Sequence, residues 1–281
     1  MHTSVEWIAT HALLLWALLL VLAMAVGDRA WQRSARRRRH ATTSAQVHGA
    51  LRWHTAVLLL AAMLLLFGGI ALAIDTPQPG ELASFDAALA ESLHMHLSLP
   101  TLRWIAALTH LGDLLWVAAA AVLIALILLL RRHWQLAGAW VVTLLGIVPI
   151  NSGLKAVFRR ARPLHDHGFI VEHGWSFPSG HAFGAIVFYG MLAYVLLRLL
   201  PLRLHRRVIA AAVACVGLIG TSRILLQVHY FSDVLAGFAS GAMWLLVCIS
   251  ATEYLRVQTP RTAAPIGDDA NRKGTDSAHC K

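Results

Sequence analysis

Residues 114–130 read LLWVAAAAVLIALILLL, an apolar run that contains no charged residue. A helix needs about 20 mostly apolar residues, with a range of about 17–25, to cross the hydrocarbon core of a bilayer. The run is long enough, and comparable segments lie at approximately 7–26, 55–74, 134–150, 182–200, 208–226 and 234–251. The sequence therefore predicts an all-α integral membrane protein with about seven spans.

The composition of the 281-residue chain agrees with this prediction. Hydrophobic residues make up 58% of the chain and charged residues 14%, whereas a soluble domain carries about 25% charged residues. This balance excludes an ordinary water-soluble globule, and the high apolar content excludes a disordered chain. Cys215, Cys248 and Cys280 show no spacing typical of a disulfide framework or a metal site.

The net charge of +10 follows from where the 24 basic residues fall relative to the spans. If seven helices alternate across the membrane, 18 of the 24 basic residues lie on one side. The positive-inside rule then places the amino terminus outside and the carboxyl terminus in the cytoplasm. The charge is thus a topology signal and predicts no nucleic-acid partner. Six basic residues lie on the outer side: Arg103, Lys155, Arg159, Arg160, Arg162 and Arg223.

Two segments near the amino end carry weaker signals. The run 7–26 has the position of a signal peptide, but no Lys or Arg precedes it and it is too long, which favours a retained transmembrane helix. In the outer loop 75–113, apolar residues every four positions predict an amphipathic helix with Ser84 as candidate N-cap. We expect this helix either on the outer membrane surface or packed on the end of the bundle. The repeated residues are Phe85, Leu89, Leu93 and Leu97.

The first of three polar clusters on the outer side follows the fourth span, in which Pro149 predicts a kink. Lys155, Arg159 and Arg162 are spaced at four and three, so they share a face if the helix continues as far as Pro163. Arg offers a fork of donors and Lys a point charge, which suits a phosphate group. Anchoring to anionic lipid headgroups is the alternative.

The second cluster, Ser176-Phe-Pro-Ser179-Gly180-His181, leads into the fifth span. Its residues favour a helix start with exposed backbone N–H donors, which is a site for an anion. His181 would lie just inside the helix, where it can give a proton to a leaving oxygen. A simple helix cap is the alternative.

The third cluster contains Ser222, Arg223, His229 and Asp233. On a helix, His229 and Asp233 would share a face, and a carboxylate on one imidazole nitrogen leaves the other as a nucleophile or base. A buried polar pair that joins two helices is the alternative. Together the three clusters supply what phosphoryl transfer through a phosphohistidine needs.

No cofactor and no metal are expected. No carboxylate cluster for magnesium accompanies these residues, and the histidine pairs lack a third ligand. Those pairs are His94 with His96 and His165 with His167. His110 and Asp113, at the outer end of the third span, are further candidates for lining the pocket.

The spacing of these residues resembles the signature of the type 2 phosphatidate phosphatase superfamily. Six residues separate Lys155 from Arg162-Pro163, and Pro178-Ser179-Gly180-His181 follows. Five residues separate Ser222-Arg223 from His229, and three separate His229 from Asp233. The resemblance covers approximately residues 50–255 and implies the six-helix core of that superfamily. The chain adds an amino-terminal helix and an Arg-rich loop.

The resemblance also implies a role for each matched residue. His229 would be the nucleophile, Asp233 would orient it, and His181 would protonate the leaving group. The phosphate oxygens would be bound by the cations and the helix start, with Ser222 in support. These binding residues are Lys155, Arg162, Arg223, Ser179 and Gly180.

We therefore expect a metal-independent phosphatase that hydrolyses a lipid phosphate or diphosphate on the outer leaflet of a bacterial inner membrane. Candidate substrates are undecaprenyl diphosphate, phosphatidate, phosphatidylglycerophosphate and lipid A phosphates. A phosphotransferase with the same phosphohistidine, or a non-catalytic headgroup transporter or sensor, are the alternatives. The expected units are residues 1–52 (extra helix and Arg-rich loop), 53–255 (phosphatase core) and 256–281 (disordered cytoplasmic tail). The sequence carries no signal for the oligomeric state.

Overall fold

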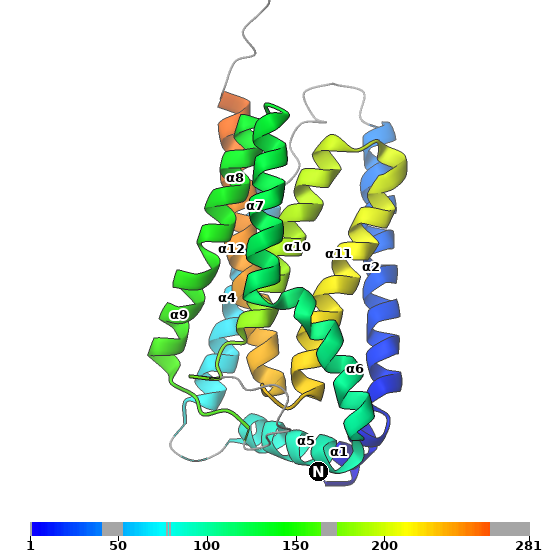
Figure 1. Ribbon diagram of the computed structural model, residues 1–281, viewed down its shortest axis with the longest axis vertical. Coiled ribbons are helices and arrows are strands. Elements are labelled where there is room, and N and C mark those ends of the chain that lie inside the picture. Colours follow the sequence, from blue (N-terminus) through cyan, green and yellow to red (C-terminus); the bar gives the residue numbers. More distant parts are fainter. Residues whose placement is uncertain (1, 41–52, 77, 79, 164–172, 259–281) are drawn as a thin grey trace, which may run out of the picture.

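The computed structural model describes residues 2–40, 53–76, 78, 80–163 and 173–258, and these residues form helices and turns without a strand. Long helices stand side by side, and short helices lie across one end of the bundle (Figure 1). Within the described ranges, six helical segments are long and apolar enough to cross a membrane, and a bent pair at the amino end would make seven. The predicted all-α membrane fold is therefore confirmed.

The helices keep to the predicted apolar runs, with some changes at their ends. In chain order they are α1 (His2–Thr10), α2 (Ala12–His40), α4 (Trp53–Ile74), α5 (Glu81–His96), α6 (Leu99–Thr109), the 3₁₀ turn η1 (His110–Gly112), α7 (Leu114–Leu130), α8 (Trp134–Leu145), α9 (Ile147–Phe158), α10 (Gly180–Leu199), α11 (Leu202–Leu225) and α12 (Phe231–Gln258).

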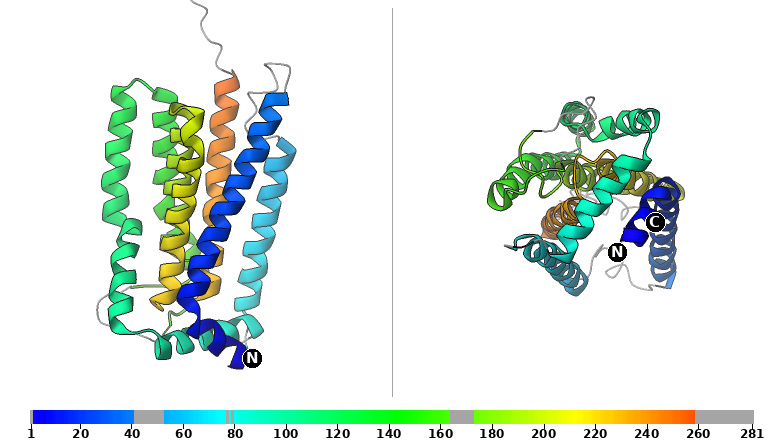
Figure 2. Two further views of the ribbon diagram at one scale, coloured as in Figure 1. Left: turned by 90° about the vertical axis from the view of Figure 1, so that its right-hand side faces the viewer. Right: turned by 90° about the horizontal axis from the view of Figure 1, so that it is seen from below.

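The bounds predicted for the first span are wrong. The chain breaks at His11, and the axes of α1 and α2 differ by 78° there. The short helix α1 lies with α5 across the end of the bundle, as the view along the bundle shows (Figure 2). Val5 and Ala9 of α1 are buried in one apolar cluster with Leu89 and Leu93 of α5. Because this contact buries the apolar side of α1, the helix follows α5 instead of continuing the line of α2.

The predicted helix in the outer loop is α5, and of its two expected positions the structure shows the one packed on the bundle. Its buried residues include Leu89 and Leu93, two positions of the predicted repeat. The expected cap at Ser84 is wrong, because α5 already begins after Gly80, which is extended and offers no side chain. The helix α6 was not expected, although Ser98 caps it and Pro100 follows in its first turn, a typical start signal.

The fourth span is broken into α8 and α9 at Gly146. Pro149 has no N–H for the carbonyl of Leu145, and its ring crowds that carbonyl, so the expected kink falls one turn before the proline. Trp244 of α12 lies against the break, where a Cβ on Gly146 would come within 2.4 Å of its ring. Beyond the break, α9 runs to Phe158 and therefore carries Lys155 on its last turn.

The helices α10 and α12 approach each other closely at two glycines of α12. A Cβ on Gly237 would lie 2.7 Å from the carbonyl oxygen of Ser179, and one on Gly241 would lie 2.8 Å from that of Phe183. The two glycines thus let α12 approach the backbone at the start of α10. In the same contact, the Ser179 N–H donates to the Asp233 carbonyl at 3.0 Å. Helix packing here brings the second and third polar clusters together.

Substitution of Gly237 tests this contact. We expect Gly237→Ala to lower the free energy of unfolding by about 1–3 kcal/mol, because the new methyl group has no space beside α10. Thermal unfolding of the purified protein in detergent measures the change. Gly138→Ala is the matched control, since Gly138 lies inside α8 with nothing within 4 Å of its Cβ position. Equal stability of the two variants would contradict the proposed role of the contact.

Candidate active site

The three polar clusters meet at one end of the bundle. Lys155 and Arg162 come from the end of α9 and the chain after it, and His181 comes from the first turn of α10. The third cluster spans the end of α11, the turn that follows and the start of α12. The carbonyl of Arg223 accepts from the backbone N–H of His229 at 3.3 Å, so the turn folds back on α11.

His229 and Asp233 form the buried centre of the site, with 2% and 0% of their surfaces exposed. His229 lies in the turn before α12 and not on the helix, which differs from the expectation of a shared helical face. The two side chains still meet, with His229 Nδ1 at 3.5 Å from Asp233 Oδ2. Ser176 Oγ lies 3.4 Å from the same nitrogen and also donates to Asp233 Oδ2. The backbone N–H of Tyr230 donates to that oxygen at 2.9 Å.

The opposite edge of the imidazole faces a cation. Arg162 Nη1 lies 3.1 Å from His229 Nε2 and donates to the carbonyl of Val228 at 2.8 Å. Burial, with smaller contributions from Arg162 and Arg223, lowers the pKa of His229 to about 4, although Asp233 acts in the opposite direction. With this pKa the imidazole is neutral at neutral pH, and with its proton on Nδ1, toward Asp233, it would present the lone pair of Nε2 on the side of Arg162.

The predicted shared face of Lys155, Arg159 and Arg162 is wrong. The helix α9 ends at Phe158, and Arg159 takes a left-handed conformation with φ of 44°. The chain turns there, so Arg159 is exposed and its Nε donates only locally, to the carbonyl of Ala156. Arg162 is nevertheless brought near Lys155, because both reach the segment before α10. Lys155 Nζ donates to the Trp175 carbonyl at 2.9 Å, and Arg162 Nε donates to the Gly174 carbonyl at 3.0 Å.

The start of α10 has the geometry of a capped helix. Ser179 is the N-cap, and its hydroxyl accepts from the Ala182 N–H at 3.4 Å. Gly180 follows as the first helical residue, and a Cβ there would lie 3.1 Å from the Asn151 side-chain oxygen. His181 is next, with Nε2 at 3.1 Å from Asp113 Oδ1.

Asp113 joins the site through this contact with His181. Its other oxygen lies 2.6 Å from His110 Nδ1, so His110 and Asp113, the two further candidates of the sequence, both belong to the surroundings of His181. Gly112 packs beside them, since a Cβ at this position would lie 3.0 Å from the His181 ring and 2.7 Å from Ile219. The break between α6 and α7 therefore holds the imidazole of His181 by one carboxylate and one close backbone contact.

Ser222 and Arg223 are bound to Thr109, the last residue of α6 before the same break. Both donate to the hydroxyl of Thr109, Ser222 Oγ at 3.0 Å and Arg223 Nη1 at 3.1 Å. Ser222 and Arg223 are 0% and 1% exposed. Ser222 thus joins the last turn of α11 to Thr109, the residue to which Arg223 is also bound.

Arg160 and Asp86 are part of the site, although neither was among the predicted site residues. Arg160 Nη1 donates to Asp233 Oδ1 at 2.6 Å and to Ser232 Oγ at 2.7 Å. Its Nη2 donates to Asp86 Oδ2 at 2.8 Å. Burial alone would lower the pKa of Arg160, but Asp233 and Asp86 outweigh it and raise the pKa. The guanidinium also stacks over the Tyr230 ring at 4.3 Å.

Asp86 carries the network back to α5. This carboxylate is 1% exposed, and it accepts from the Ser232 N–H at 3.1 Å as well as from Arg160. A charged residue directly beside the apolar repeat of α5 was the available signal. His94 is near Gln227, with 3.3 Å between its Nδ1 and the amide oxygen, and His165 and His167 lie outside the described residues. Among the described residues, no three His, Cys, Asp or Glu side chains gather as a metal site.

Comparison with known proteins agrees with a helical bundle that spans a membrane. The sequence matches the PAP2 superfamily over residues 136–256. It is 35% identical to phosphatidylglycerophosphatase B of Bacillus subtilis (strain 168) over 149 residues, which are 48% of this chain and 68% of the relative. It is 30% identical to the lipid A 1-phosphatase of Rhizobium etli over 183 residues, 57% of this chain and 74% of that one.

A solved structure is similar as well. The crystal structure of a transmembrane PAP2 type phosphatidylglycerolphosphate phosphatase from Bacillus subtilis superposes with a TM-score of 0.63 and 27% identity. The superposition covers 70% of this chain and 96% of that one. The fold and the site thus define an integral membrane protein of the phosphatase type. The chain belongs to the PAP2 superfamily, which confirms the resemblance found in the sequence.

The adjacent residues Arg159 and Arg160 offer a matched test of the buried network. We expect Arg160→Lys to lower kcat about tenfold with little change in KM, because one ammonium cannot reach both Asp233 and Asp86 as the guanidinium fork does. Arg159→Lys should keep kcat within about twofold, because that side chain is exposed. Steady-state hydrolysis of a lipid phosphate in detergent measures both. Similar kinetics for the two variants would show that Arg160 does not position the site.

Proposed function

We propose that this protein hydrolyses a lipid phosphate or diphosphate monoester through a phosphohistidine on His229. The observation that carries the proposal is the two-sided environment of the imidazole. Nδ1 faces the Asp233 carboxylate, and Nε2 faces Arg162. A neutral imidazole held in this way presents the Nε2 lone pair beside a cation, which suits attack on an anionic phosphorus centre.

The first step forms a bond from His229 Nε2 to phosphorus and breaks the bond from phosphorus to the lipid oxygen. His181 gives its proton to that oxygen, and Asp113 stabilises the protonated imidazole before transfer. Asp233 stabilises the positive charge that develops on the His229 ring. Three cations, Lys155, Arg162 and Arg223, stabilise the charge on the phosphoryl oxygens. At the start of α10, the side chain of Ser179 and the N–H of Gly180 add hydrogen bonds to these oxygens.

The second step returns the enzyme to its first state. Water attacks phosphorus as the neutral His181 accepts its proton, the bond from nitrogen to phosphorus breaks, and inorganic phosphate leaves. The side-chain cations supply the positive charge that a phosphoryl group needs, so the reaction is proposed to need no metal. A chelator is therefore expected to leave the rate unchanged.

The relatives support a lipid as the group that carries the phosphate. One is named a phosphatidylglycerophosphatase and another a lipid A 1-phosphatase, so their names differ in the lipid and share the phosphate. For this chain we propose only what the two names share, the removal of a phosphate from a lipid. Undecaprenyl diphosphate and phosphatidate complete the set of four lipids from which release of phosphate should be compared.

We place the reaction on the outer leaflet of a bacterial inner membrane. The amino terminus and the site lie at the same end of the bundle (Figure 1). The alternation of the predicted spans assigns 18 of the 24 basic residues to the other side. The positive-inside rule supports a cytoplasmic position for that other side. In this orientation, we propose that residues 1–52 form an additional helix with its loop, residues 53–255 the phosphatase core and residues 256–281 a cytoplasmic tail.

Replacement of His229 is the direct test of the mechanism. His229→Ala should lower phosphate release by at least about a thousandfold, because no other group is placed to take the phosphoryl group. Release is measured from purified protein in detergent with EDTA, and His133→Ala, an exposed histidine at the other end of the bundle, is the control. Full activity of the His229 variant would overturn the phosphohistidine.

The titration of His229 in acid is a second, independent test of its environment. Because burial lowers its pKa to about 4, the neutral imidazole should persist as the pH falls through 6.5 and become protonated only near pH 4. Nuclear magnetic resonance of ¹⁵N-histidine-labelled protein measures this titration, and the spectrum of His229→Asn identifies the signals. Titration of His229 near pH 6.5 would contradict the buried, cation-flanked environment.

A further inference from the structure

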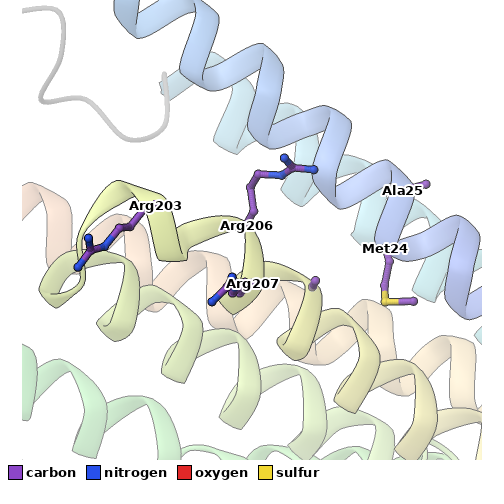
Figure 3. Close-up of a pocket in the computed structure, with 6 residues that line it drawn as sticks. Met24, Ala25, Arg203, Arg206 and Arg207 are labelled. Carbon is purple, nitrogen blue, oxygen red and sulfur yellow. The ribbon is translucent and has the colours of Figure 1, made fainter.

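A cavity of about 580 Å³ lies between α2 and α11, at the end of the bundle opposite the active site. Met24 and Ala25 of α2 form one wall, and α11 forms the other with three arginines and an alanine (Figure 3). The α11 residues are Arg203, Arg206, Arg207 and Ala210. None of these residues takes part in the site described above.

The cavity follows from how the two helices pack. A Cβ on Gly217 would lie 2.5 Å from Leu20 Cδ2, so α2 and α11 are in close contact at this level. The helices run in opposite directions, and one turn beyond Leu20 the wall of the cavity begins with Met24. The apolar part of α2 ends shortly afterwards, at Asp28 and Arg29. The cavity therefore lies at the level where hydrocarbon gives way to headgroups.

Among the described residues that line the cavity, the charged ones are all arginines. Arg203, Arg206 and Arg207 are spaced at three and four, so their exposed side chains leave the same side of α11. Figure 3 shows Arg206 extending toward α2 across the space between the helices. The carboxylate at this end of α12, Glu253, is engaged by Arg198 and Tyr194. No acidic residue lies in the first turn of α11.

We propose that this cavity binds the phosphate headgroup of an anionic phospholipid from the leaflet opposite the active site. Guanidinium groups recognise phosphate by paired donors, and basic pockets between membrane helices at the cytoplasmic side bind such headgroups. Met24, Ala25 and Ala210 contact the glycerol end of the acyl chains. The lipid joins α2, which precedes the phosphatase core, to α11 of that core.

Native mass spectrometry of the detergent-purified protein tests this site, with phosphatidylglycerol and phosphatidylcholine as the probes. The wild-type protein should bind phosphatidylglycerol more tightly than phosphatidylcholine. Arg206→Gln with Arg207→Gln should weaken the binding of phosphatidylglycerol about tenfold or more. The matched control is Arg131→Gln with Arg132→Gln, which removes the same charge from the exposed α7–α8 turn at the same end of the bundle.

The control pair should keep wild-type affinity, and both double variants should keep phosphatase activity. Equal losses for the two pairs would overturn the proposal, because the lipid would then respond to surface charge in general. Equal binding of the two lipids to the wild-type protein would also overturn it. A third measurement adds inorganic phosphate. If phosphate alone displaces phosphatidylglycerol at equal concentration, the cavity is a site for the free anion and the lipid assignment is wrong.

Discussion

The buried carboxylate of Asp233 is the constraint on which the rest of the site depends. A carboxylate removed from water needs a cation beside it and hydrogen-bond donors for its remaining lone pairs, or its burial is strongly unfavourable. Here the partners come from separate segments: Arg160 follows α9, Ser176 precedes α10, and the Tyr230 N–H belongs to the turn before α12. The hydrogen bonds to one carboxylate therefore hold three segments together around His229.

The network continues from Asp233 to the helix that lies across the bundle. Arg160 joins Asp233 to Asp86, and Asp86 also accepts from the backbone at Ser232. One guanidinium thus balances two buried carboxylates, which leaves a net negative charge that the surrounding N–H and O–H donors stabilise. The position of α5 and the orientation of His229 are consequently coupled, although they are more than a hundred residues apart in the chain.

The sequence predicted the spans well because long apolar runs admit few alternatives in a membrane. It also selected the residues that gather at the site, since each stands at a fixed spacing within one short segment. It did not select Arg160 over Arg159, because the choice depends on the left-handed turn at Arg159 and on the distant Asp86. The break at His11 was missed for a similar reason, since the contact of Val5 and Ala9 with α5 joins segments that no local pattern connects.

The close fit around His181 has an entropic consequence. Gly112 touches one side of its ring and Asp113 fixes one nitrogen, so the imidazole has little rotational freedom left. The proposed partner of that imidazole is a lipid, and the bilayer confines the motion of a lipid to a plane with its headgroup at a nearly constant depth. In the proposed reaction, bringing the leaving oxygen to His181 would therefore cost mainly the lateral and rotational freedom of the substrate, and almost none of the freedom of the proposed acid.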